Sequence, residues 1–217
     1  MAQAVRDLVE LVVVVDPTYD QNCYVLHRRD SDAALVVDPG LQNRAALQLL
    51  SDRGWRCERI LLTHGHADHV NGVPAVVAEH HCPVALHPLD REQLVSIRFL
   101  PGIPADVPDI EIDEDLVDGQ VIAWEGIEVG VLHTPGHTRG SVCFMVGEDL
   151  VSGDTLFRRG VGRADLPGGD WEQLMHSIEG RLYKLPPAIA VHPGHGMSTT
   201  IGEEMEGNPF IVHPRYR

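Results

Sequence analysis

Basic residues are scarce in this sequence. Its 217 residues include 17 Lys and Arg against 32 Asp and Glu, which gives a formal net charge of −15. A protein that binds nucleic acid needs a basic surface that neutralises phosphates. The composition therefore argues against a nucleic-acid partner.

Cysteines and long apolar runs are scarce as well. The four cysteines are scattered, with no Cys-x-x-Cys pair, which argues against a disulfide framework and against a thiolate zinc site. We expect reduced, buried thiols. The apolar run 11–15 is too short for a signal peptide or a membrane span. These features predict a cytoplasmic protein with no membrane partner.

The rest of the chain reads as short apolar strands alternating with amphipathic helices. We expect strands over 8–15, 23–28, 33–37, 59–62, 84–86, 121–124, 127–132, 142–146, 150–152 and 189–191. We expect helices over 43–53, 70–79 and 170–184, the last with Asp170 as N-cap. The first three strands suggest an antiparallel meander, and 100–118, rich in proline and acidic residues, a surface loop. Because no linker divides the chain, 1–217 is predicted to be one α/β domain.

A cluster of metal-ligand residue types follows the strand predicted at 59–62. The segment LLTHGHADHVNG, 61–72, places three histidines and one aspartate within six positions. Gly65 would let the backbone bend between two of these histidines. Imidazole and carboxylate groups suit zinc, iron or manganese. Further candidates lie in HTPGHTRGS, SGDTLF and HPGHG. The full candidate set is His64, His66, Asp68, His69, His137, Asp154 and His195.

Together, the motifs VVDPG, LLTHGHADH, TPGHTRGS, GDTLF and PGHG resemble those of the metallo-β-lactamase-fold hydrolases, and most closely the glyoxalase II-like thioester hydrolases. The resemblance covers nearly the whole chain. It implies an αββα sandwich, with two mixed β-sheets and helices on the outer faces. It also implies a first metal at His64, His66 and His137, a second at Asp68, His69 and His195, and Asp154 as the bridge.

Two divalent ions, which we expect to be zinc with iron or manganese as alternatives, would lower the pKa of a water molecule from 15.7 towards ~7. The resulting hydroxide could attack the carbonyl of a small acyl-thioester, and the thiolate leaves without a strong acid. Asp68 and Asp154 are the candidate catalytic carboxylates of this reaction.

Two further residues are candidates for supporting roles. Asp38 could accept the second N–H of a metal-bound histidine, or it could be a turn residue beside Pro39. Arg163, in FRRGVGRADLPG, stands where the family has a basic residue that contacts the thiol, and could pair with a substrate carboxylate. Asp165 replaces the aromatic residue that the family has two positions later.

Three alternatives to thioester hydrolysis remain. The segment GRADLPGGD resembles persulfide dioxygenases, which use one iron, but Thr155 and Gly196 differ from that branch. True β-lactamases commonly have a Cys ligand where this chain has Asp154, which disfavours lactam hydrolysis. A non-catalytic pseudoenzyme would have lost ligands, and all seven are present. Only 217 − 195 = 22 residues follow His195, too few for the C-terminal helical domain of glyoxalase II proper. The sequence therefore leaves the thiol carrier open, and it also leaves the oligomeric state open.

Overall fold

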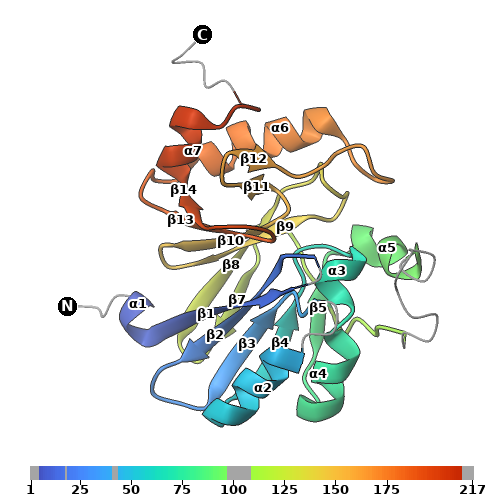
Figure 1. Ribbon diagram of the computed structural model, residues 1–217, viewed down its shortest axis with the longest axis vertical. Helices are drawn as coiled ribbons and strands as arrows, with labels where there is room; N and C mark the ends of the chain where they lie inside the picture. The colour runs from blue at the N-terminus through green and yellow to red at the C-terminus, as the bar shows by residue number, and fades with distance from the viewer. Residues whose placement is uncertain (1–4, 18, 41–43, 97–108, 212–217) are drawn as a thin grey trace. The chain divides into compact units, whose positions relative to one another are not determined.

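The computed structural model describes residues 5–17, 19–40, 44–96 and 109–211. The chain divides into two compact units, Met1–Leu116 and Val117–Arg217, called here the N-terminal and C-terminal units. Each unit contains its own six-stranded sheet (Figure 1). The prediction that 1–217 forms one domain stays a prediction.

The sheet of the N-terminal unit is mixed. Its first three strands are antiparallel, as predicted, and the next three run parallel to the third. In sheet order they are β1 (Val9–Asp16), β2 (Gln21–Arg28), β3 (Ala33–Val37), β4 (Arg56–Leu61), β5 (Val84–Leu86) and β6 (Glu114–Asp115). Because β3 and β4 are parallel, the segments that follow them begin at the same edge of the sheet. Asp38 and the histidine-rich turn therefore start close together.

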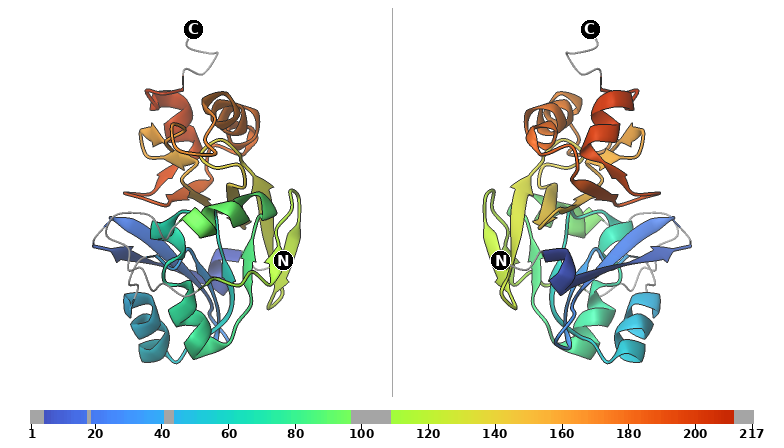
Figure 2. Two further views of the ribbon diagram at one scale, coloured as in Figure 1. Left: turned by 90° about the vertical axis from the view of Figure 1, so that its right-hand side faces the viewer. Right: turned by 90° about the vertical axis from the view of Figure 1, so that its left-hand side faces the viewer.

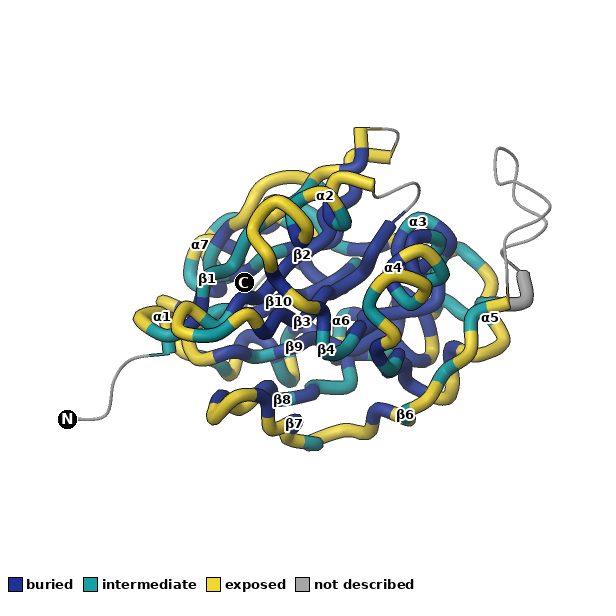
Figure 3. Tube along the Cα trace, turned by 90° about the horizontal axis from the view of Figure 1, so that it is seen from below, coloured by how far each residue is buried: buried dark blue, intermediate teal, exposed yellow. Residues whose placement is uncertain are grey.

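Two helices of this unit cover one face of its sheet (Figure 2). Leu50 of α2 (Arg44–Arg53) and Val76 of α4 (Val73–His80) pack in one apolar cluster with Val36 and Ile60 of the sheet. The remaining helices of the unit are short: α1 (Val5–Leu8), α3 (Ala67–Val70), the 3-10 helix η1 (Pro88–Asp90) and α5 (Arg91–Ser96). Figure 3 shows the result, with β3 buried while α4 keeps an exposed side.

The sheet of the C-terminal unit begins as an antiparallel meander and then adds a parallel strand. In chain order its strands are β7 (Val121–Trp124), β8 (Ile127–His133), β9 (Val142–Val146), β10 (Asp149–Gly153), β13 (Ala190–Pro193) and β14 (Thr199–Thr200). β13 lies beside β10 and parallel to it. Strands β11 (Leu156–Phe157) and β12 (Gly160–Val161) form a separate small hairpin.

The described part of the C-terminal unit contains two α-helices. In α6 (Trp171–Gly180), Leu174 and Ile178 pack against Leu150 and Val191 of the sheet, and the Asp170 carboxylate accepts a hydrogen bond from the N–H of Gln173 as the predicted N-cap. α7 (Ile201–Gly207) follows β14, and the 3-10 helix η3 (Leu182–Lys184) follows α6. None of the helices in the described ranges is long and apolar enough to cross a membrane.

Most predicted elements are present, with shifted limits. The helix predicted over 170–184 ends at Gly180, and the one predicted over 70–79 is α4, which begins at Val73, while Val70 is the last residue of α3. The segment predicted as a surface loop over 100–118 contains β6, and its part up to 108 lies outside the described residues, as does residue 43. All four cysteines are free and buried, as predicted.

Candidate metal centre

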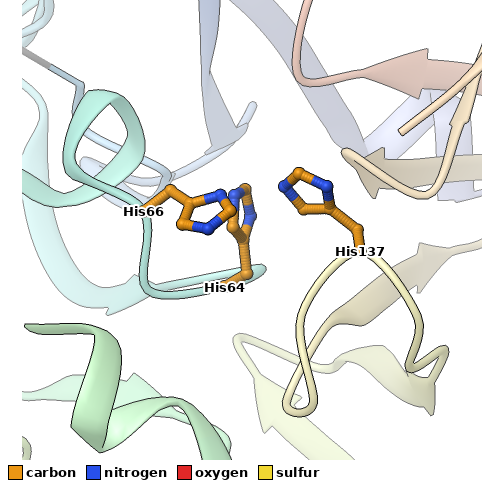
Figure 4. Close-up of side chains that lie close together, drawn as sticks. All are labelled: His64, His66 and His137. Carbon is orange, nitrogen blue, oxygen red and sulfur yellow. The ribbon is translucent and has the colours of Figure 1, made fainter. Parts of the chain in front are cut away.

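The turn between β4 and α3 holds His64 and His66 (Figure 4). Gly65 between them has no positive φ, and the reason for glycine that the structure shows is close packing. A Cβ at Gly65 would lie 2.8 Å from the carbonyl oxygen of Asp90 and 2.8 Å from Cβ of Gln93. The Gly65 N–H also donates to the buried Asp90 carboxylate, at 2.9 Å. Close packing against Asp90 therefore fixes this turn.

The rings of three histidines lie close together in the N-terminal unit. The centroid of the His64 ring lies 4.8 Å from that of His66 and 4.1 Å from that of His69. His64 and His69 are buried, and His66 is partly exposed. Asp68 lies on α3 beside them, with its carboxylate 3.8 Å from Nε2 of His69. Four of the seven predicted ligands thus lie together on one short segment.

A chain of hydrogen bonds determines which nitrogen of each histidine ring carries the proton. Oγ1 of Thr63 donates to Asp38 at 2.6 Å, so it must accept the contact of 3.0 Å from Nδ1 of His64. Nδ1 of His69 donates to the same Asp38 carboxylate at 2.9 Å. Both rings therefore carry their proton on Nδ1. Their Nε2 atoms are then lone-pair donors, the form that binds a metal.

Asp38 joins the two histidines to the backbone. Its buried carboxylate also accepts the N–H of Thr63 at 2.7 Å, and its φ of 51° lies in the left-handed region. Asp38, His64 and His69 each offer a ligand atom within 4.8 Å of the others. Because the Asp38 oxygens already receive three hydrogen bonds, we interpret Asp38 as the residue that orients the histidines. Both descriptions left open by the sequence, turn residue and histidine support, fit this geometry.

Three candidate ligands meet in the C-terminal unit. Asp154 follows β10 and His195 follows β13, and because these strands are parallel neighbours both residues lie at one sheet edge. His137 lies on the loop between β8 and β9 (Figure 4). Oδ2 of Asp154 is 3.6 Å from Nε2 of His137 and 3.6 Å from Nε2 of His195.

The donor set around Asp154 fits a cation. Nδ1 of His137 lies 2.7 Å from the carbonyl oxygen of Arg163, which can only accept, so Nδ1 carries the proton and Nε2 is a lone-pair donor. That nitrogen lies 3.6 Å from Oδ2 of Asp154. Metal–ligand bonds of about 2.0–2.2 Å place two ligand atoms roughly 3.4 Å apart at a tetrahedral angle. A divalent metal would satisfy both atoms.

The segment 162–165 has two functions around Asp154 and His137 of the C-terminal unit. A Cβ at Gly162 would lie within bonding distance of the carbonyl oxygen of Asp154 and 3.1 Å from Nδ1 of His137, so only glycine fits there. The next residue, Arg163, orients His137 through its carbonyl oxygen. The guanidinium of Arg163 is exposed and forms two hydrogen bonds of 3.0 Å with Asp165. The hydrogen bond from Arg163 lowers the pKa of the Asp165 carboxyl.

Sequence reasoning identified the ligand types but missed their supports. Thr63, Asp90, Gly162 and the carbonyl oxygen of Arg163 were not predicted. A backbone oxygen has no sequence signature, and Asp90 stands in PLDRE, which looks like an ordinary surface segment. The hydroxyls of Thr138 and Ser141 form a hydrogen bond of 2.7 Å within the His137 loop.

Comparison with known proteins identifies the family. A sequence model of the metallo-beta-lactamase superfamily matches residues 16–195. The chain belongs to this superfamily. Hydroxyacylglutathione hydrolase GloC of Haemophilus influenzae is 35% identical over 214 residues, covering 94% of this chain and 97% of the relative.

Two solved structures support the same assignment. The crystal structure of BLEG-1, a B3 metallo-beta-lactamase, is 35% identical with a TM-score of 0.85, covering 94% of this chain and 99% of that one. TTHA1623 in a di-iron-bound form is 37% identical with a TM-score of 0.80, covering 92% of this chain and all 100% of that one. The predicted α/β metallo-β-lactamase fold with two mixed sheets is confirmed, and so is the glyoxalase II-like resemblance.

The family and the donor set together support a metal-dependent hydrolase. Members of the superfamily share this fold, and the histidines and carboxylates described above are the ligand types that divalent metals take. One similar structure carries two iron ions, so the comparisons leave the choice between zinc and iron open.

Proposed function

We propose that this protein hydrolyses small acyl-thioesters of the S-lactoylglutathione type, with two divalent metal ions. The observation that carries the proposal is the Asp154 carboxylate, whose Oδ2 lies equally far from two histidine nitrogens. A bridging carboxylate needs that arrangement. The similarity to a hydroxyacylglutathione hydrolase over 94% of the chain supports the substrate class.

The ligand assignment in this proposal follows the family pattern. His64, His66 and His137 would hold one ion, Asp68, His69 and His195 the other, and Asp154 would bridge them. When bound, the ions lower the pKa of water and stabilise negative charge on a carbonyl oxygen. Zinc is the ion we expect, with iron or manganese as alternatives.

The chain's own residues would prepare this chemistry. The Asp38–Thr63 pair keeps His64 and His69 in the tautomer that binds metal, so no proton has to move when an ion arrives. The carbonyl of Arg163 does the same for His137. Asp68 is partly exposed, so it is accessible to substrate as well as to metal.

Arg163 is proposed as the contact for an anionic substrate. Its guanidinium is exposed, but two of its N–H groups already donate to the Asp165 carboxylate. A substrate carboxylate would have to displace Asp165. An exposed ion pair of this kind contributes little net free energy, so displacement is feasible but reduces affinity. We therefore expect weak binding of anionic thioesters and tolerance of different thiols.

Two observations justify testing a second reaction on the same protein. A similar structure, 35% identical, is described as a B3 metallo-beta-lactamase, although Asp154 stands where other lactamases have cysteine. The segment 162–170 resembles persulfide dioxygenases. A β-lactam and a glutathione persulfide should therefore be assayed beside the thioester.

The decisive experiment combines metal analysis with turnover. Protein loaded with zinc, manganese or iron should contain close to two ions per chain and hydrolyse S-lactoylglutathione. Asp154→Ala should lose both ions and activity, because one carboxylate serves both. The matched control is Asp149→Ala, which removes a carboxylate of the same strand that pairs with His192 at 2.9 Å. This control should keep both.

Other outcomes would replace the proposal. One iron per chain, with oxygen uptake on the persulfide and no thioester turnover, would establish the dioxygenase. Faster turnover of the β-lactam than of any thioester would establish a lactamase. An Asp154→Ala protein with two ions and normal turnover would refute the bridging role.

A further inference from the structure

Two of the four cysteines lie against each other, in the N-terminal unit. Sγ of Cys57, in β4, is 3.6 Å from Sγ of Cys82, which lies just before β5. Both thiols are free. Neither belongs to the candidate metal ligands, which follow the opposite end of β4. The pair is therefore a feature that the proposed hydrolysis does not use.

A β-bulge creates this contact. In the pairing of β3 with β4, Ala34 lies opposite Cys57 but Leu35 lies opposite Arg59, so Glu58 is skipped. Side chains of a regular strand alternate between faces, and Cys57, three residues before Ile60, would point away from the Ile60 side. The extra residue turns Cys57 onto the helix-covered face, where it joins Ile60 and Cys82 in one cluster.

Cys82 is accessible to a small molecule. It lines a pocket of about 580 Å³, together with Val77 of α4, His81, Ile110 and Asp113. The residue itself is only 6% exposed, so its sulfur is reached through the pocket and is not displayed on the surface. Because the pocket lies where β5 begins, it is separate from the ligands at the carboxyl end of β4.

The two thiols differ in their readiness to ionise. Contact with Cys82, followed by burial, raises the pKa of Cys57, and its thiol donates to the carbonyl of Arg59 at 3.4 Å. Its contact with the Cys57 sulfur lowers the pKa of Cys82. Cys82 is thus the better nucleophile, and it is also the one that faces the pocket.

We propose that Cys57 and Cys82 form a thiol pair that a hydroperoxide entering the pocket oxidises to an intramolecular disulfide. The Cys82 thiolate attacks the outer peroxide oxygen, the O–O bond breaks, and the alkoxide or hydroxide leaves and takes up a proton. Cys82 is then a sulfenic acid. Cys57 attacks its sulfur, the S–O bond breaks, and water leaves with the thiol proton of Cys57. Two thiols lose two electrons in total, and the peroxide gains them.

The disulfide would join the start of β4 to the start of β5. These strands are already neighbours in the sheet, so the bond needs only the approach of two sulfurs that are in contact. The proposal does not depend on the thioesterase proposal, since no metal ligand takes part.

Hydrogen peroxide and tert-butyl hydroperoxide, applied to the zinc-loaded protein, test the pair, because zinc has no redox chemistry of its own. Intact mass should fall by two hydrogen atoms, peptide mapping without reductant should find Cys57 joined to Cys82, and dithiothreitol should reverse both changes. Cys57→Ser should stop at a sulfenic acid on Cys82 that dimedone traps. Cys82→Ser should give neither product.

The matched control is Cys143→Ser, which removes another buried thiol of the chain and should leave the Cys57–Cys82 disulfide intact. Wild-type protein alone already decides the question. Oxidation that begins at Cys23 or Cys143, or that drives Cys82 to a sulfinic acid with Cys57 still reduced, would overturn the proposal. Urea unfolding of each variant identifies any that fails to fold.

Discussion

Replacing Asp38 by asparagine tests whether the hydrogen-bond chain controls metal binding. The Asp38 carboxylate accepts three hydrogen bonds, two on the oxygen shared by Thr63 Oγ1 and His69, and one on the oxygen that faces the Thr63 N–H. An amide has only one acceptor oxygen. In either orientation, its NH₂ group must face at least one of these donors.

The size of the effect follows from what the amide does to each donor. With NH₂ towards Thr63 N–H, one buried donor loses its acceptor, at a cost of about 1–3 kcal/mol in stability. With NH₂ towards His69, the ring must move its proton to Nε2, the nitrogen that would bind metal. Loss of a partner that orients a ligand typically lowers metal affinity about 10–100-fold. We expect Asp38→Asn to show both effects.

The assay is zinc affinity by competition with a chromophoric chelator, together with urea unfolding of the metal-free protein. The control is Asp16→Asn, a buried carboxylate at the end of β1 that accepts the N–H of Tyr19 at 3.3 Å. That variant should change stability but not zinc affinity. Wild-type zinc affinity in Asp38→Asn would refute the reasoning and leave Asp38 as a turn residue only.

Two further predictions concern the loops. Asp165→Asn should lower KM for anionic thioesters about 2–5-fold, because it frees the Arg163 guanidinium from an exposed ion pair, and should leave neutral thioesters unchanged. Arg163→Ala should raise KM for the anionic substrates and spare kcat and metal content, since its backbone carbonyl still orients His137. Steady-state kinetics with matched anionic and neutral thioesters checks both variants. Loss of metal in Arg163→Ala would contradict the separation of substrate binding from metal binding. Gly65→Ala should weaken metal binding, because its Cβ would lie 2.8 Å from the carbonyl oxygen of Asp90. In the control Gly54→Ala, a Cβ meets nothing within 4 Å, so the variant should lose stability through its φ of 65° but keep its metal affinity. Equal loss of metal in both variants would show a general folding defect.

The sequence predicted the elements that depend on local pattern. Short apolar runs identified the strands, and Asp170 identified the start of α6. It missed α7, whose sequence IGEEMEG is short and largely acidic, because burial of Ile201 against the rest of the unit stabilises this helix more than its own pattern does. The β11–β12 hairpin, with two residues in each strand, was too short to show a period.

The site divides along the same line. Histidine and aspartate are recognisable as ligand types, so the candidate metal ligands could be named from the sequence and its family resemblance. Their supports could not be, because the partners of Gly65 and His137 lie 25 and 26 residues away and include a backbone oxygen. The tautomers of the histidines follow only from those long-range contacts.

The two sheets also imply an order in which the ligand groups assemble. Six residues contain His64, His66 and His69, so one turn and α3 bring these histidines together once Asp38 lies beside them. His137, Asp154 and His195 span 59 residues, and Asp154 meets His195 only when β13 has paired with β10. Contacts between distant parts of a chain form late in folding, because closing a long loop costs entropy before the contact stabilises the chain. A metal ion added to the unfolded chain should therefore bind the N-terminal histidines first, and the group of His137, Asp154 and His195 should form only with the parallel strand of the C-terminal sheet.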